Sequence, residues 1–290
     1  MLKVKNTVAL DWRKGPDCIY FIFKDENTYC RLDLADGRLA PGHPTTIDGH
    51  WGGFEPHIKN LCFGLTITDL SSQPPSDGDV LWLFYTENDT PMVCAYSQDE
   101  DKVVSKSRLA GTFWGPLVPH FKKIIGAIWT GSDTWEADER RTEFRRKCEK
   151  IPSGLSSGYF ATKTERKLSA IYNRNPKYSC TAPEAFEVNV SKKFSGHKIF
   201  MFLNDGTYIE CKYPSGISAP LPLADTPWAK LEPYKDLIMT IVQNDQPLFY
   251  TEFYIFLKDG RYLIMESQLF QLKGPFPIEK EFPYLMQDTD

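Results

Sequence analysis

The positions of hydrophobic and polar residues along the chain predict β-hairpins. Short apolar runs occur in pairs, and a short polar turn joins the two members of each pair. This arrangement is typical of antiparallel strands. Four hairpins align well with one another, and their first strands are expected at 20–25, 81–86, 199–204 and 254–260. A fifth apolar pair within 159–172 aligns poorly with the others.

A second pattern recurs between the hairpins. It begins with a tryptophan, has a proline five residues later, and continues with a histidine or a tyrosine. The copies are Trp51 to His57, Trp114 to His120, Trp228 to Tyr234 and, in degraded form, Phe282-Pro283-Tyr284. Self-similarity at a period of about fifty residues indicates repeated units such as propeller blades. The sequence therefore predicts an all-β chain built from repeats.

The spacing of the linker prolines bears on the number of repeats. The intervals are 63 residues from Pro56 to Pro119, 114 from Pro119 to Pro233, and 50 from Pro233 to Pro283. Residues 136–195 contain no linker of this kind, so we expect a partly helical insertion within one repeat. Two repeats in the long interval remain the alternative, because 114 is twice 57.

Composition narrows the class of protein and its partners. Hydrophobic residues make up 41% and aromatic residues 14%, which suits a globular protein with sheets packed on large side chains. The formal charge of −4 gives no general attraction for nucleic acid or an anionic membrane, so neither is expected as a partner. The seven cysteines form no CxxC pair, and neither a signal peptide nor a long apolar run is recognisable. We therefore expect a cytoplasmic protein without a disulfide framework.

The first repeat carries the clearest family resemblance. Tyr20-Phe-Ile-Phe-Lys-Asp begins a hairpin, Tyr29-Cys-Arg-Leu-Asp completes it, and a Gly-His-Pro segment at 42–44 leads to Trp51-Gly-Gly-Phe. This succession resembles the hemopexin-like repeat, and further copies extend the resemblance over most of the chain. The resemblance implies a four-bladed β-propeller that forms one domain over 1–290, with five blades as the alternative. The expected blades are 1–54, 55–117, 118–231 with its insertion at about 136–195, and 232–290.

The resemblance also implies that the first strand of each blade lines a central channel. These strands supply the candidate pocket-lining residues Asp11, Trp12, Thr66, Trp129, Thr130, Thr240 and Gln243. Alternation along a strand sends some of these side chains into the channel and others into the sheets. A packing role remains open for each one, and the sequence singles out no catalytic residue.

The histidines and Asp-Gly pairs favour structural roles. His57 and His120 occupy equivalent linker positions, where the later repeats carry Tyr234 and Tyr284. Because tyrosine replaces histidine there, we expect packing plus a hydrogen bond, and no metal site. The three Asp-Gly pairs are first of all turn signals. No cofactor is expected, although the resemblance is compatible with a structural cation in the channel.

The functional expectation comes from the resemblance, because no hydrolase, P-loop, dinucleotide or zinc-protease motif is present. Some hemopexin-like proteins of fungal natural-product clusters are hetero-Diels-Alderases, which join a tropolone quinone methide to a humulene-type terpene. The resemblance thus implies a cofactor-independent pericyclase that binds apolar small-molecule substrates. A non-catalytic module that binds haem, a polyamine or a sugar is the alternative. A lectin-like propeller ranks last, because the repeats differ in their polar residues.

Overall fold

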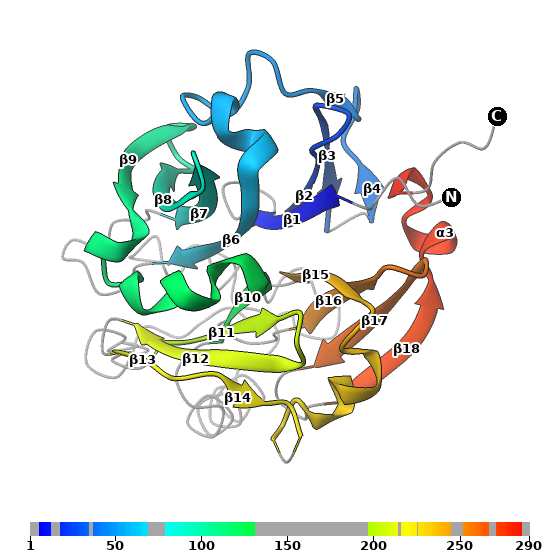
Figure 1. Cartoon of the computed structure of the whole chain (residues 1–290). Coiled ribbons are helices and arrows are strands. Elements are labelled where there is room, and N and C mark those ends of the chain that lie inside the picture. The colour runs from blue at the N-terminus through cyan, green and yellow to red at the C-terminus, as the bar shows by residue number, and fades with distance from the viewer. Residues whose placement is uncertain are drawn as a thin grey trace, which may run out of the picture. The chain divides into compact units, whose positions relative to one another are not determined.

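The computed structural model is mostly β, with several antiparallel sheets joined by short helices (Figure 1). It describes residues 6–12, 18–34, 37–68, 79–130, 197–213, 216–224, 226–244, 252–266 and 271–285. The chain divides into two compact units, and all described residues belong to the unit formed by Met1–Ser132 and Phe194–Asp290. The predicted insertion at 136–195, with its charged segment and the poorly aligned hairpin, lies outside the described residues.

Two sheets form from consecutive strands in the first part of the chain. The first sheet has the order β1-β2-β3-β4, and the short β5 also pairs with β3. Its strands are β1 (Thr7–Trp12), β2 (Cys18–Phe23), β3 (Thr28–Asp33), β4 (Arg38–Leu39) and β5 (Thr45–Thr46). The second sheet has the order β6-β7-β8-β9. Its strands are β6 (Leu61–Thr68), β7 (Asp79–Glu87), β8 (Thr90–Ser97) and β9 (Lys102–Arg108).

The remaining strands form two further antiparallel groups. The first is β10 (Ile124–Thr130), β11 (His197–Leu203), β12 (Thr207–Tyr213), β13 (Gly216–Ile217) and β14 (Leu221–Pro222). The second is β15 (Ile238–Gln243), β16 (Glu252–Leu257), β17 (Arg261–Glu266) and β18 (Gln271–Pro277). A parallel pairing of Gly126 with Ile241 joins β10 to β15. A Cβ at Gly126 would lie 2.8 Å from the Ile241 backbone nitrogen, so this close approach requires glycine.

The Trp-to-Pro linkers form short helices that connect the groups. Trp114 and Trp228 directly precede helices, and both are buried, as is Trp51. Pro56 and Pro116 lie within the first two positions of their helices, where the missing N–H of proline would have no partner, whereas the linker prolines Pro119 and Pro233 lie inside theirs. The helices are η2 (Glu55–Asn60), η3 (Leu109–Gly111), η4 (Gly115–Lys123), η6 (Ala229–Tyr234), α3 (Ile278–Glu281) and η7 (Pro283–Leu285).

The first strands of the four groups lie against one another in a cyclic order. Strand β6 contacts β1 and β10, and β15 contacts β10 and β1. Four hydrophobic clusters follow the same order, because each one combines residues of two successive groups. The cluster with Ala9 and Phe21 of the first sheet also contains Val242 and Phe256 of the last group. The first and last groups therefore pack together as the intermediate ones do.

The outer strands have features that oppose pairing with another chain. Strands β4, β5, β13 and β14 have two residues each. The pairing of β9 with β8 has a bulge between Ala95 and Tyr96, and β18 contains Pro275 and Pro277. Short strands, bulges and prolines are the usual protection of exposed sheet edges.

Candidate functional site

A buried polar network joins the first two sheets near the carboxyl ends of β1 and β6. The Thr66 backbone N–H donates to Asp11 Oδ1 at 3.0 Å, and Thr66 Oγ1 donates to the Asp11 carbonyl oxygen at 2.6 Å. The Gln98 amide, directly after β8, donates from Nε2 to Thr66 Oγ1 at 2.8 Å. All three residues are buried. The network therefore fixes β1, β6 and the end of β8 relative to one another.

Strands β1 and β6 run in the same direction at this contact. A Cβ on Gly64 would meet Leu10, and two residues further along β6, Thr66 bonds Asp11. Both contacts thus advance along both strands. The carboxyl ends of β1 and β6 therefore lie at one side, and so do those of β10 and β15, which pair in parallel at Gly126.

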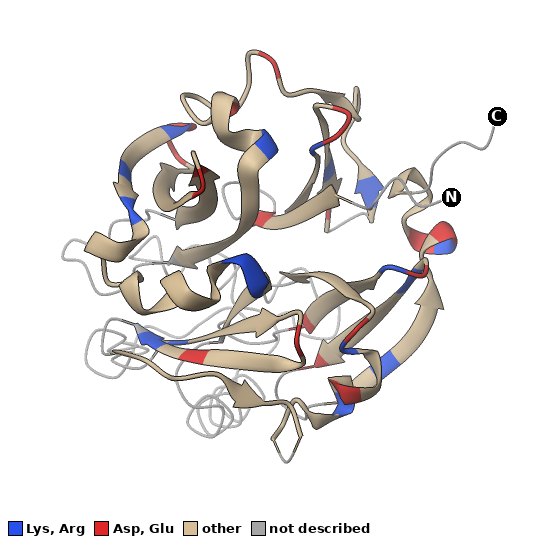
Figure 2. Cartoon of the chain, viewed as in Figure 1, with Lys and Arg blue, Asp and Glu red and all other residues tan. Residues whose placement is uncertain are grey.

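Asp11 is the single charged residue in the four first strands as the structure bounds them. Figure 2 shows the charged residues lying mainly on the other strands and on the connecting segments. A lone carboxylate within apolar strands is costly to bury unless it accepts hydrogen bonds, which the Thr66 N–H supplies. The network therefore provides the main polar feature of the first-strand assembly.

The other predicted pocket residues are distributed over different faces. Thr240 and Gln243 are both buried on β15, but they lie on opposite faces of the strand. Thr240 pairs with Phe256, which packs between the last and first groups, and Gln243 pairs with Phe253, which packs between the third and last groups. The structure therefore joins Asp11 with Thr66 but places Thr240 and Gln243 on different faces.

The predicted tryptophans belong to hydrophobic clusters between sheets. Trp12 lies in the cluster of the first and second sheets, and Trp129 in that of the second sheet and the β10 group. Thr130 ends β10 and pairs with Lys198. These positions make both tryptophans part of the packing between neighbouring groups.

An aromatic cluster surrounds Trp12 close to the polar network. The ring centroid of Trp12 lies 5.2 Å from that of Tyr20, 5.9 Å from that of Trp51 and 6.1 Å from that of Tyr96. Tyr96 Oη donates to Asp101 Oδ1 at 2.9 Å. Burial, and then this hydrogen bond to a carboxylate, raise the pKa of Tyr96, so its phenol stays protonated. The cluster is a largely buried set of aromatic rings in which the Tyr96 hydroxyl is protonated.

Sequence reasoning missed Gln98 and Tyr96, because both belong to the third strand of the second sheet or its end. A glutamine that follows an apolar strand carries no distinctive pattern. The signal that could have drawn attention is Gln98 itself, a polar residue that follows the apolar run at 92–96 after Ser97. Only the packing of sheets reveals that it reaches Thr66.

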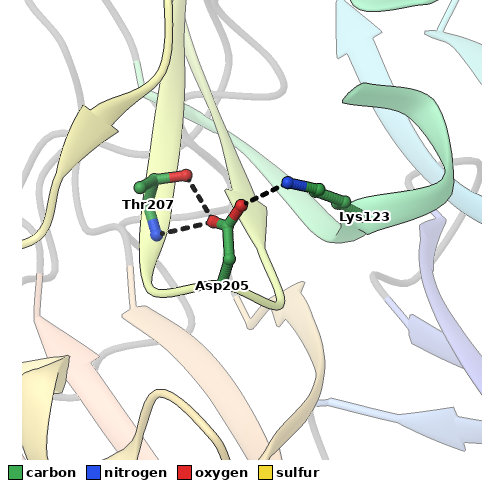
Figure 3. A network of polar contacts seen from close by, with 3 residues as sticks. All are labelled: Lys123, Asp205 and Thr207. Atoms are coloured by element: carbon green, nitrogen blue, oxygen red, sulfur yellow. Dashed lines mark hydrogen bonds and ion pairs between the residues drawn. The ribbon is translucent and has the colours of Figure 1, made fainter. Parts of the chain in front are cut away.

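One Asp-Gly pair has the expected turn role in detail. Asp205 Oδ1 accepts from the Thr207 N–H at 3.2 Å and from Thr207 Oγ1 at 2.6 Å, and Lys123 Nζ donates to Oδ2 at 2.9 Å (Figure 3). The Thr207 hydroxyl first, and then Lys123, hold the pKa of Asp205 below its usual range. Gly206 has φ +78°, which favours glycine.

Within the described ranges, no three or more His, Cys, Asp or Glu residues are grouped so that they could hold a metal ion. In the same ranges, no helix has both the length and the apolar character needed to cross a membrane. Comparison of the chain with protein-family models and with curated proteins gave no match.

Proposed function

We propose that the four groups of strands are the blades of a hemopexin-like β-propeller. The cyclic order of β1, β6, β10 and β15 supports four blades, since β15 returns to β1. The recurrence of a Trp-to-Pro linker between successive groups supports the same repeat. Because the first strands of the four groups already contact one another in a cycle, we infer that the segment between β10 and β11 is an insertion within the third blade.

The proposed function is that of a pericyclase, which binds two apolar small molecules and promotes an intermolecular hetero-Diels–Alder cycloaddition. The observation that carries this proposal is the buried polar network of Asp11 on β1, Thr66 on β6 and Gln98 directly after β8, beside the aromatic cluster. Such a reaction requires two partners held in reactive geometry and one carbonyl polarised by a hydrogen-bond donor. The reaction itself consumes no cofactor. Hydroxyl and amide donors at the strand ends are the groups suited to that polarisation.

The experiment compares product mixtures formed from a tropolone quinone methide precursor and humulenol. With the protein present, we expect a higher yield or an altered stereoisomer ratio relative to the spontaneous reaction and to heat-denatured protein. Gln98→Leu removes the buried amide of the network and should reduce the effect. Gln271→Leu makes the same chemical change at an exposed position of β18 and should leave it intact. An unaltered spontaneous mixture contradicts the pericyclase proposal.

A non-catalytic binding module is the second candidate. It is favoured by the way in which Asp11, Thr66 and Gln98 bond one another, as residues of a structural scaffold do. Calorimetric titration with haem, spermidine and simple sugars tests this candidate. Tight binding of one of these ligands, together with an unaltered product mixture, would replace the pericyclase by a binding module.

A further inference from the structure

The linker between the first two sheets is fastened to strand β9 by three contacts. The Val103 N–H donates to the Gly52 carbonyl oxygen at 2.9 Å. Lys106 Nζ donates to the Gly53 carbonyl oxygen at 3.0 Å and lies 3.0 Å from His57 Nε2. A single lysine of β9 therefore holds two points of the linker 51–57.

The contact between Lys106 and His57 defines the protonation state of the imidazole. A lysine ammonium has only donors, so His57 Nε2 must be the acceptor and carry no proton. The proton of neutral His57 is then on Nδ1, which lies 3.9 Å from Glu87 Oε1. Protonation of Nε2 would remove the acceptor and place a second positive charge beside the ammonium.

The surroundings of His57 oppose its protonation. The charged or titratable groups facing it are Lys106 from β9 and Glu87 and Tyr85 from β7, while Glu55 and Lys59 lie on its own helix, η2. Its ring lies 4.7 Å from that of Tyr85, measured between centroids. Burial first, and then Lys106, lower the pKa of His57, and only Glu87 acts in the opposite direction.

We infer that His57 is a pH-sensitive clamp, which holds the linker 51–57 on β9 when neutral and releases it when protonated. A histidine whose folded-state pKa is depressed loses stabilisation as the pH falls through the value of the free imidazole, 6.5. The clamp is therefore complete above about pH 7.5 and weakens toward pH 5. Trp51, which begins this linker, has φ +60° and packs in the aromatic cluster.

The second linker provides a natural control within the chain. His120 occupies the position equivalent to His57 and is half-buried as well, but no contact with a lysine holds it among the described residues. The later linkers carry tyrosines at this position. Among the described residues, the contact between a lysine and the linker histidine therefore occurs in the first linker and not in the second.

The test is amide hydrogen exchange at Val103, whose N–H bonds the linker, measured at pH 7.5 and pH 5.0 and corrected for intrinsic rates. At pH 5.0 an imidazole of pKa 6.5 is largely protonated in the open state. If folded His57 stayed fully neutral, the equilibrium constant for opening would therefore be about 30-fold larger at pH 5.0 than at pH 7.5. We expect an increase between about 3-fold and this limit. His57→Gln keeps an acceptor for Lys106 without titrating and should abolish the pH dependence, whereas His120→Gln should retain it.

Two results would overturn the inference. One is equal protection of Val103 at both pH values in the unaltered protein. The other is a pH dependence that persists in His57→Gln. Should this variant fail to fold, ¹⁵N-histidine NMR of the unaltered protein decides: a proton on Nδ1 and a pKa below 6.5 support the clamp, and a proton on Nε2 contradicts it.

Discussion

Replacing Thr66 by valine tests the polar network between the first two sheets. Valine has nearly the same shape, so the change mainly removes the hydroxyl. That hydroxyl accepts from Gln98 Nε2 at 2.8 Å and donates to the Asp11 carbonyl oxygen at 2.6 Å, and all three residues are buried. Each buried group that loses its partner costs about 1–3 kcal/mol. Because the two effects are not fully additive, we expect the free energy of unfolding to fall by about 2–4 kcal/mol.

The matched control is Thr7→Val on β1. Thr7 is also buried, but its Oγ1 has no hydrogen-bond partner among the described residues. Valine there removes an unsatisfied hydroxyl, so stability should stay unchanged or rise by up to about 1 kcal/mol. Urea denaturation followed by circular dichroism gives both values, provided that the slope m is unchanged. A loss below about 1 kcal/mol for Thr66→Val, or an equal loss in both variants, would refute the reasoning.

Two further predictions concern a turn and the thiols. Lys123→Met should lower the free energy of unfolding by less than about 1 kcal/mol, because the ion pair of Lys123 with Asp205 is largely exposed. Asp205→Ala should lower it further, because this change also removes both hydrogen bonds from Thr207. The Asp205 contribution should be present above about pH 4 and be lost as the pH falls through its lowered pKa, which urea curves between pH 7 and pH 2.5 will check. Burial raises the pKa of Cys62 and raises that of Cys94 to about 12, but Cys62 is half-exposed whereas Cys94 is buried. At pH 8 iodoacetamide should therefore modify Cys62 before Cys94, as peptide mass spectrometry will show.

Hairpins and turns were predictable because their signals are local. The predicted hairpin strands at 199–204 and 254–260 overlap β11 and β16 and extend into the turns that follow them, where Gly206 and Gly260 have the positive φ values that Asp-Gly turns require. The linkers were also recognisable, since a tryptophan and a proline at fixed spacing recur with every helix η2, η4 and η6.

The faces of the first strands were not predictable. A strand buried on one face alternates apolar and polar residues, but β1 is buried at all six positions. Its sequence therefore lacks the alternation that would assign Asp11 or Trp12 to a face. Lys106 was missed for a related reason: its contact with His57 joins residues 49 positions apart and depends on how the linker lies over β9.

The most direct test of the account is a crystal structure with a tropolone substrate analogue bound. We predict four blades in the order of β1, β6, β10 and β15, with the analogue at the carboxyl ends of these strands and its carbonyl oxygen hydrogen-bonded to a donor of the polar network, such as the Gln98 amide. A different order of the first strands, or an analogue that binds away from their carboxyl ends, would contradict the account.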